Sequence, residues 1–229
     1  MTGSIDVGLI TFPSINYEPM PSQTTLRHPD RALDDRHGER SYKEGPRKPV
    51  KVGFDLDGVL FFNPLRFVRG PLDLIKKGAT LEYIPKTRIE QFLWRIIHMS
   101  SFTPASGWQR IRKLSEAGLI EPYVITARFK CLRKDFERCM QIVDAPDYFA
   151  GCYQNLQDEQ PHKYKERMIN ELGIEYYVED NWNIVEHLTK TTSAHILWVS
   201  NMFDANIKFD RRFNNLAEAL QELETIVKK

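Results

Sequence analysis

Two aspartates separated by a single residue form the most chemically suggestive part of the sequence. Asp55 and Asp57 lie in the segment FDLDGVLF, directly after an apolar run and directly before Gly58. A glycine at that point lets the chain turn sharply out of a strand, so both carboxylates can converge on one site. Carboxylates this close repel each other unless one is protonated or a cation lies between them, and Mg²⁺ prefers oxygen ligands. The pair therefore predicts a divalent metal site.

Two other interpretations of this segment involve no enzyme chemistry. An Asp before a Gly is common in exposed turns, and this would be the preferred interpretation if the motif stood alone. A calcium-binding EF-hand loop needs further oxygen ligands and a closing Glu, whereas the segment DLDGVLFFNPLR becomes apolar directly after the glycine. The calcium loop is therefore set aside, and the turn is weighed against residues elsewhere in the chain.

Polar residues also end other apolar runs farther along the chain. Thr126 ends the run VIT, and Glu179 and Asp180 end the run YYVED. Because the carboxyl ends of parallel strands share one edge of a sheet, we expect these groups to lie near Asp55. Lys163, in QPHKYKERM, begins a helical segment from which its side chain would reach the same crevice.

Short apolar runs alternate with amphipathic segments from residue 49 onward, which is typical of buried parallel strands covered by helices. The expected strands span residues 50–56, 122–126, 147–153, 175–179 and 195–200. The expected helices span residues 104–117, 129–143, 162–172, 183–190 and 215–227. We therefore predict an α/β fold with a Rossmann-like open parallel sheet.

Two segments depart from this alternation. Residues 1–48 are rich in Pro, Ser, Thr and mixed charges without a sustained period, which predicts a flexible tail before a domain of residues 49–229. Residues 61–103 follow the first expected strand and show only helical patterns, such as TRIEQFLWRIIHM. We interpret residues 61–103 as a small helical cap inserted after that strand, above the edge of the sheet where ligands bind in such folds.

Four of these segments, DLDGV, VITAR, PHK and VED, resemble in this order the motifs of the haloacid dehalogenase-like (HAD) hydrolase superfamily. Each motif is short, but all four occur in the right order on a parallel-sheet pattern, and the resemblance covers about residues 50–200. It implies a HAD-like phosphatase that requires Mg²⁺. The TAR ending is similar to that of some nucleotidase-like members.

The resemblance implies distinct roles for the two aspartates of the first motif. Asp55 would be the nucleophile that attacks phosphorus and carries a transient aspartyl-phosphate until water releases it. Asp57 would protonate the departing alkoxide as general acid, and would then deprotonate the attacking water as general base. Retention of this second Asp favours phosphoryl transfer over dehalogenation.

The second and third motifs would bind the phosphoryl group. Thr126 would donate its hydroxyl and Ala127 its backbone N–H, while Lys163 would neutralise charge on the nucleophile and the transferred group, with Lys165 as the alternative lysine. Arg128 would either pair with a second phosphate or a carboxylate of the substrate, or form an ordinary salt bridge at the surface. Outside this constellation, Thr126 would be a common strand-end residue and Lys163 a solvated helix residue.

The first and fourth motifs would hold the metal ion. Asp55 would be a ligand, and Asp57 would contribute its backbone carbonyl. Asp180 would bind the ion directly, and Glu179 would either be another ligand or orient a metal-bound water. Mg²⁺ is the cofactor that the resemblance implies.

Composition excludes several other classes of protein. Lys and Arg total 32 against 31 for Asp and Glu, so the net charge provides no general attraction to nucleic acid or anionic membranes. Cys131, Cys139 and Cys152 lack the spacing of a zinc site or disulfide framework. No run of about 18 apolar residues predicts a membrane span, and the N-terminus lacks the pattern of a secretory signal, so we expect a cytoplasmic protein.

The function predicted from the sequence is hydrolysis of a phosphomonoester, with a nucleotide or other small phosphorylated metabolite as substrate. A phosphomutase or other phosphotransferase uses the same residues and passes the phosphoryl group to a second hydroxyl instead of water. A non-catalytic scaffold domain is an alternative of a different class. A phosphatase acting on nucleic-acid ends is disfavoured, because the basic segments FKCLRKDFERCM and IKFDRR alternate with acidic residues.

Overall fold

The computed structural model describes residues 48–63, 87–99, 101, 103–201 and 204–229. The predicted tail, except for Lys48, and most of the first half of the predicted cap lie outside the described residues. The division of the chain into a tail of residues 1–48 and a domain of residues 49–229 therefore stays a prediction.

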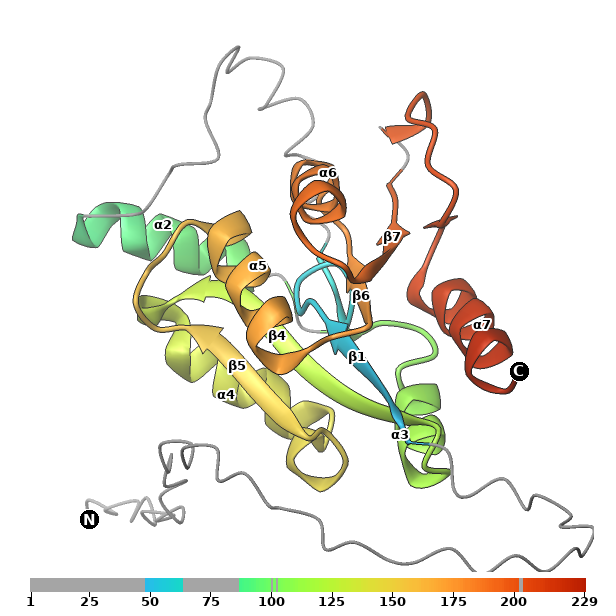
Figure 1. The fold of residues 1–229 in the computed structure, drawn as a ribbon. Coiled ribbons are helices and arrows are strands. Elements are labelled where there is room, and N and C mark those ends of the chain that lie inside the picture. Colours follow the sequence, from blue (N-terminus) through green and yellow to red (C-terminus); the bar gives the residue numbers. More distant parts are fainter. Residues whose placement is uncertain (1–47, 64–86, 100, 102, 202–203) are drawn as a thin grey trace, which may run out of the picture. The chain divides into compact units, whose positions relative to one another are not determined.

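The central element is a six-stranded parallel sheet with the strand order β5-β4-β1-β6-β7-β8, and its strands run side by side in Figure 1. The strands are β1 (Val50–Phe54), β4 (Ile120–Phe129), β5 (Gly151–Asn155), β6 (Tyr176–Glu179), β7 (His195–Val199) and β8 (Arg212–Phe213). The predicted open parallel sheet is confirmed. The order places β1 at the centre, and in such folds ligands bind at the carboxyl ends of the central strands.

The strand register brings the predicted site residues to one level of the sheet. Phe54 of β1 pairs with Val124 of β4 on one side and with Val178 of β6 on the other. The residue directly after β1 is Asp55, and the strands beside it continue through Thr126 in β4 and to Glu179 in β6. The carboxyl ends of β1, β4 and β6 thus form one polar rim, as predicted from the sequence.

Helices cover both faces of the sheet, because successive strand residues point to opposite sides. In β4, Val124 joins an apolar cluster with α3, α4 and α7, whereas its neighbours Tyr123 and Ile125 join a second cluster with α5 and α6. Figure 1 shows these helices packed along the sheet. They are α3 (Gln109–Glu116), α4 (Arg133–Ile142), α5 (Pro161–Leu172), α6 (Trp182–Thr191) and α7 (Leu216–Val227). Each lies within a segment predicted to be helical or differs from it by one residue at an end.

The predicted cap differs from its all-helical description. A helix, α2 (Arg88–Met99), lies where the pattern TRIEQFLWRIIHM predicts one. However, β2 (Phe61–Phe62) and β3 (Thr103–Pro104) form an antiparallel pair at the two ends of the segment. Strands of two residues are too short to show an alternating pattern, so the sequence did not reveal this pair.

Two further features of the sheet were also missed. One is β8, an edge strand that lies beside β7. It has only two residues, so it too is too short to show an alternating pattern. β4 continues three residues beyond its predicted end, and its register with β5 shifts between Thr126 and Phe129. This irregularity is a β-bulge, which bends a strand and redirects its side chains.

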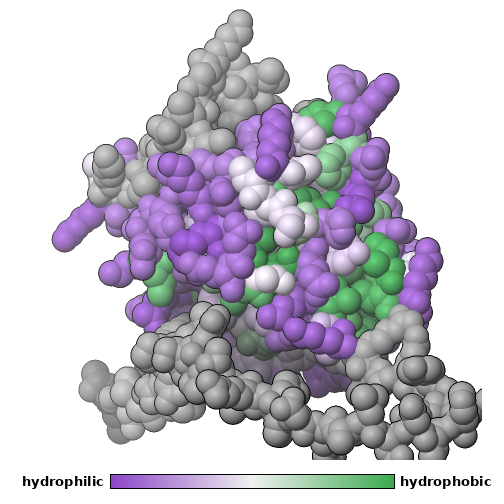
Figure 2. All heavy atoms as spheres, in the orientation of Figure 1, coloured by the Kyte–Doolittle hydropathy of each residue, from purple (hydrophilic) through white to green (hydrophobic). Residues whose placement is uncertain are grey.

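The outer surfaces of the helices are largely polar. In the view of Figure 2, hydrophilic residues cover much of the described surface, with hydrophobic residues between them. Within the described residues, every helix is too short or too polar to cross a lipid bilayer.

Candidate active site

Asp55 lies at the centre of the polar rim, directly after β1. Its backbone N–H donates to the carbonyl of Val178 on β6 at 3.0 Å, so the sheet pairing continues to this residue and fixes its direction. Its side chain is buried, and the Nζ atom of Lys165 lies 3.0 Å from its Oδ1. Asp55 is therefore a carboxylate held rigidly beside a cation.

The lysine that lies beside Asp55 is Lys165, whereas the sequence predicted Lys163. Both belong to α5, but Lys163 is exposed, whereas Lys165 is only 2% exposed. Residues two positions apart point in nearly opposite directions around a helix, at roughly 200°. Lys165 shares the inward face of α5 with Tyr164, Met168 and Ile169, so it is the lysine that reaches Asp55. It was the alternative considered from the sequence.

Three carboxylates converge at this point. One oxygen from each of Asp55, Glu179 and Asp180 lies within 4.8 Å of the others. Lys165 also donates from Nζ to Oε2 of Glu179 at 2.6 Å, and Glu179 is completely buried. Lys165 thus lies between the carboxylates of Asp55 and Glu179, and Asp180 adds a third carboxylate close by.

The pKa values of the cluster reflect its burial and the closeness of its charged groups. Burial raises the pKa of Asp55 to about 6, with further contributions from the nearby charges of Asp180 and Asp57, although Lys165 opposes the shift. Burial likewise raises the pKa of Glu179 to about 8. Burial alone would lower the pKa of Lys165, but its two carboxylate partners outweigh it and raise the pKa. The cluster is therefore stabilised by either a proton or a cation.

The residues present fit a hard divalent cation. Carboxylate oxygens are the ligands that Mg²⁺ and Ca²⁺ prefer, and the cluster offers three of them within 4.8 Å of one another. The Asp180 side chain is closely packed: a Cβ at Gly58 would overlap its Oδ2, and Gly58 has a φ of +84°. The indole N–H of the buried Trp198 donates to the Asp180 backbone carbonyl at 3.2 Å. Close packing against Gly58 and the hydrogen bond from Trp198 thus both restrict the position of Asp180.

Thr126 lies on β4, beside β1, as the sequence predicts. Its side chain is buried, and its Oγ1 accepts a hydrogen bond from the backbone N–H of Arg128 at 3.3 Å. A hydroxyl that accepts one hydrogen bond still has its own proton to donate to another acceptor. Ala127, whose backbone N–H is the other predicted phosphate donor, follows at the bulge and is partly exposed.

Of the two roles considered for Arg128, an anion of the substrate or a salt bridge at the surface, the structure shows a salt bridge, and this pair is buried. Its side chain is 1% exposed, and its Nε and Nη2 atoms donate to the two carboxylate oxygens of Asp57 at 2.8 and 2.7 Å. The Asp57 carboxylate is therefore held by an arginine, separate from the three-carboxylate cluster. A metal contact from Asp57 through its backbone carbonyl stays a prediction.

Ser101 is a site residue that the sequence did not reveal. Its Oγ donates to Oδ1 of Asp57 at 2.7 Å, although the two residues are 44 positions apart. It is buried and precedes β3, at the end of the predicted cap. A serine before a short strand carries no local signal, so only the folded chain identifies it.

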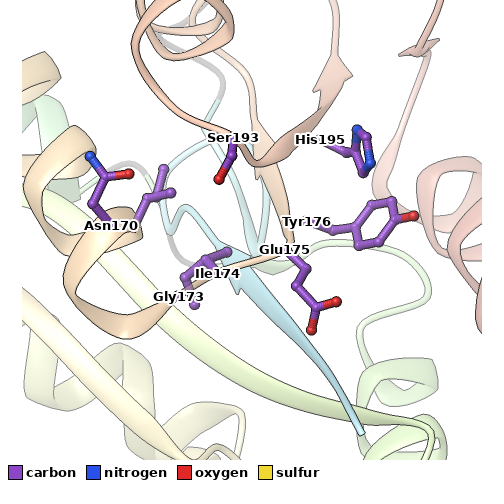
Figure 3. Close-up of a pocket in the computed structure, with 8 residues that line it drawn as sticks. Asn170, Gly173, Ile174, Glu175, Tyr176, Ser193 and His195 are labelled. Atoms are coloured by element: carbon purple, nitrogen blue, oxygen red, sulfur yellow. The ribbon is translucent and has the colours of Figure 1, made fainter. Parts of the chain in front are cut away.

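A separate pocket lies at the opposite end of the sheet. It is lined by the C-terminal part of α5, the start of β6 and the residues that lead into β7, including Asn170, Ser193 and His195, as Figure 3 shows. The carboxylate of Glu175 accepts a hydrogen bond there from the backbone N–H of Lys51 at 3.1 Å. The pocket is thus at the amino ends of β6 and β7, whereas the carboxylate cluster is at the carboxyl ends.

Comparisons with known proteins agree with this description of the fold. No family model matches the chain, and no curated protein is similar enough in sequence to count as a relative. Among solved structures, a putative beta-phosphoglucomutase from Thermotoga maritima is similar with a TM-score of 0.53 and 12% identity, over 77% of this chain and 99% of that chain. CbbY from Rhodobacter sphaeroides, in complex with phosphate, has a TM-score of 0.50 and 15% identity, over 73% of this chain and 95% of that chain.

A third similar structure is a HAD-superfamily hydrolase of subfamily IA from Geobacter sulfurreducens PCA, with a TM-score of 0.46 and 14% identity. The match covers 79% of this chain and 99% of that chain. Identities this low bear on the fold and leave the activity to be argued from the residues of the site. The sheet order and the covering helices agree with the two structures whose TM-scores are 0.50 or higher: the chain shares the fold of the putative beta-phosphoglucomutase and of CbbY.

Proposed function

We propose that the chain is a Mg²⁺-dependent phosphomonoester hydrolase that uses Asp55 as its nucleophile. The observation that carries this proposal is the position of the Asp55 carboxylate. It lies 3.0 Å from the buried ammonium of Lys165 and within 4.8 Å of two further carboxylates, at the carboxyl end of the central strand. A nucleophile of this kind needs cations beside it, because the phosphoryl group it attacks is itself negatively charged.

Asp55 and Asp180 would hold the Mg²⁺ ion, together with the backbone carbonyl of Asp57. When bound, the ion supplies positive charge that offsets the charge of the transferring phosphoryl group. Glu179 donates no proton in this scheme: its carboxylate fixes the ammonium of Lys165, 2.6 Å away, and accepts the backbone N–H of Asn181 at 3.0 Å. Asp180 is therefore the more direct ligand of the adjacent pair.

In the first step, an Asp55 oxygen forms a bond to phosphorus while the bond to the substrate oxygen breaks. Asp57 gives its proton to that leaving oxygen. The hydroxyl of Thr126 and the backbone N–H of Ala127 donate hydrogen bonds to the phosphoryl oxygens, and Lys165 balances their charge. The product of this step is a phosphorylated Asp55 and a free alcohol.

In the second step, Asp57 removes a proton from water, and the resulting hydroxide attacks the phosphorus of the aspartyl-phosphate. The bond between phosphorus and the Asp55 oxygen breaks, which releases inorganic phosphate and restores both carboxyl groups. The same residues would serve a phosphotransferase if a second hydroxyl replaced the water. The identity of the product separates these two reactions.

A small phosphorylated molecule is the proposed substrate. The phosphate in the CbbY complex and the name of the beta-phosphoglucomutase are in keeping with this class, and both proteins share the fold. The balance of 32 basic and 31 acidic residues favours a small substrate over a polyanion such as nucleic acid.

The test is phosphate release from a panel of phosphorylated sugars, nucleotides and glycerol phosphate, with and without Mg²⁺. We expect release that depends on Mg²⁺ and that falls by at least about 10³-fold in Asp55→Asn, because the amide is not a nucleophile. Asp147→Asn, which changes an exposed aspartate, is the matched control and should match wild type. Equal phosphate release from wild type and Asp55→Asn would refute the proposal.

A further inference from the structure

The surroundings of Asp57 suggest how its orientation is set. The guanidinium of Arg128 contacts both of its carboxylate oxygens, at 2.8 and 2.7 Å, in a two-point arrangement. The side chains of Arg128 and Asp57 are only 1% and 11% exposed. A buried, planar fork of this kind fixes the plane and direction of a carboxylate, which a single hydrogen bond does not.

A second residue holds the same carboxylate from another part of the chain. The Ser101 hydroxyl donates to Oδ1 of Asp57 at 2.7 Å, and Ser101 is 3% exposed. Arg128 is itself anchored, because its backbone N–H donates to Oγ1 of Thr126 and its Nη1 lies 3.5 Å from the sulfur of Cys139. Asp57 thus accepts hydrogen bonds from Arg128 on β4 and from Ser101, which lies two residues before β3.

The contacts of Asp57 with Arg128 and Ser101 matter because Asp57 lies next to the carboxylate cluster in the sequence. Asp57 is only two residues from Asp55, yet the carboxylates that converge within 4.8 Å in the described part of the chain are those of Asp55, Glu179 and Asp180. A free aspartate rotates among staggered side-chain conformations. With a divalent ion nearby, one of these would bring its oxygens toward that ion.

We infer that Arg128, assisted by Ser101, is a positioning residue that keeps the Asp57 carboxylate out of the cation cluster and oriented for proton transfer. The inference rests on the proposed function, in which Asp57 is the general acid and base. The guanidinium of Arg128 contacts Asp57 and Cys139, so we place its effect on catalysis in Asp57. Its loss therefore leaves the cluster of Asp55 intact but allows Asp57 to turn toward it.

The test compares Arg128→Gln and Arg128→Lys with wild type. For an alkyl phosphate, we expect kcat to fall by about 10²-fold in Arg128→Gln and by less in Arg128→Lys, because general acid–base catalysis typically contributes 10²–10⁴-fold. The loss should be smaller with p-nitrophenyl phosphate, whose leaving group needs little protonation. Mg²⁺ binding, measured by calorimetry, should stay as tight or become tighter. Arg112→Gln, which removes an exposed arginine paired with Glu116, should change neither quantity.

Two results would overturn the inference. One is a parallel loss of Mg²⁺ binding and turnover, independent of the leaving group, as expected of a generally destabilised protein. The other is a full additional loss when Arg128→Gln is combined with Asp57→Asn, since a residue that acts through Asp57 adds nothing once Asp57 is gone.

A crystal structure of Arg128→Gln with Mg²⁺ separates this inference from the proposed function. We expect the Asp57 carboxylate to be rotated from its wild-type position, and an unchanged position would overturn the inference. Wild-type protein that hydrolyses no phosphate ester would refute the proposed function, while the position of Asp57 in the variant would still decide whether Arg128 orients it.

Discussion

Two aspartates only two residues apart occupy opposite electrostatic surroundings. Asp55 shares the single ammonium of Lys165 with Glu179, and a third carboxylate lies within 4.8 Å. Asp57 instead has a guanidinium group bound to both of its oxygens. The first cluster brings three carboxylates together, whereas the second pairs one carboxylate with one guanidinium group.

The difference indicates what each region is suited to do. Burying several carboxylates close together raises the free energy of the folded protein unless a proton or a cation joins them. The Asp55 cluster is therefore suited to binding a metal ion and an electrophile. A balanced pair gains little from a further cation, and its main effect is to fix an orientation. Neighbouring residues of one turn thus acquire separate tasks from their partners.

The largest expected effect comes from removing the Lys165 ammonium group, which contacts Asp55 and Glu179. Lys165→Met should lower the free energy of unfolding of the metal-free protein by about 3–5 kcal/mol at pH 8, because it leaves buried carboxylates without their partner. Urea unfolding measures this change. Lys163→Met is the matched control on the same helix, and its exposed side chain predicts a change within about 0.5 kcal/mol. Equal effects of the two substitutions would contradict the assignment of Lys165.

A smaller effect is expected at the turn that separates the two clusters. Gly58→Ala introduces strain at a φ of +84° and a Cβ that overlaps Oδ2 of Asp180. We expect a loss of about 1–3 kcal/mol in stability and about tenfold weaker Mg²⁺ binding by calorimetry. Gly118→Ala is the control, since its φ is +67° but a Cβ there meets nothing within 4 Å. It should lose stability without changing Mg²⁺ binding, and a similar weakening there would argue against displacement of Asp180.

The third expected effect is a pH dependence confined to the Asp55 cluster. The pKa values of Asp55 and Glu179 are raised to about 6 and about 8, so between pH 4 and 8 the folded protein holds more protons than the unfolded chain. Their contribution to stability is therefore present at low pH and is lost as the pH rises through these values, by up to about 1.4 kcal/mol per pH unit for each proton. A divalent ion that replaces the protons reverses this loss.

The stabilisation by Mg²⁺, measured as the shift in Tm, should therefore be larger at pH 8 than at pH 5.5. Glu179→Gln should reduce this dependence, because it removes one of the titrating groups. A shift that is equal at both pH values, or larger at the lower one, would show that the ion binds outside this cluster.

Much of the fold and of the carboxylate cluster was predictable from local patterns. The apolar runs ending at Asp55, Thr126 and Glu179 are strands of a parallel sheet, and their carboxyl ends meet at one rim. This succeeded because each buried strand is visible in a few consecutive residues, and parallel pairing then aligns the strand ends. The pair of two-residue strands β2 and β3 escaped because so short an element has no period.

The sequence by itself determined which strands bring carboxylates together and therefore that a cluster of carboxylates would form near Asp55. The tertiary structure alone decided that Lys165 rather than Lys163 completes it, and that Arg128 and Ser101 hold Asp57. The physical reason is one of range. Strand alternation is a local property, whereas the direction of a helix residue depends on how the helix packs, and the Arg128–Asp57 pair joins residues 71 positions apart.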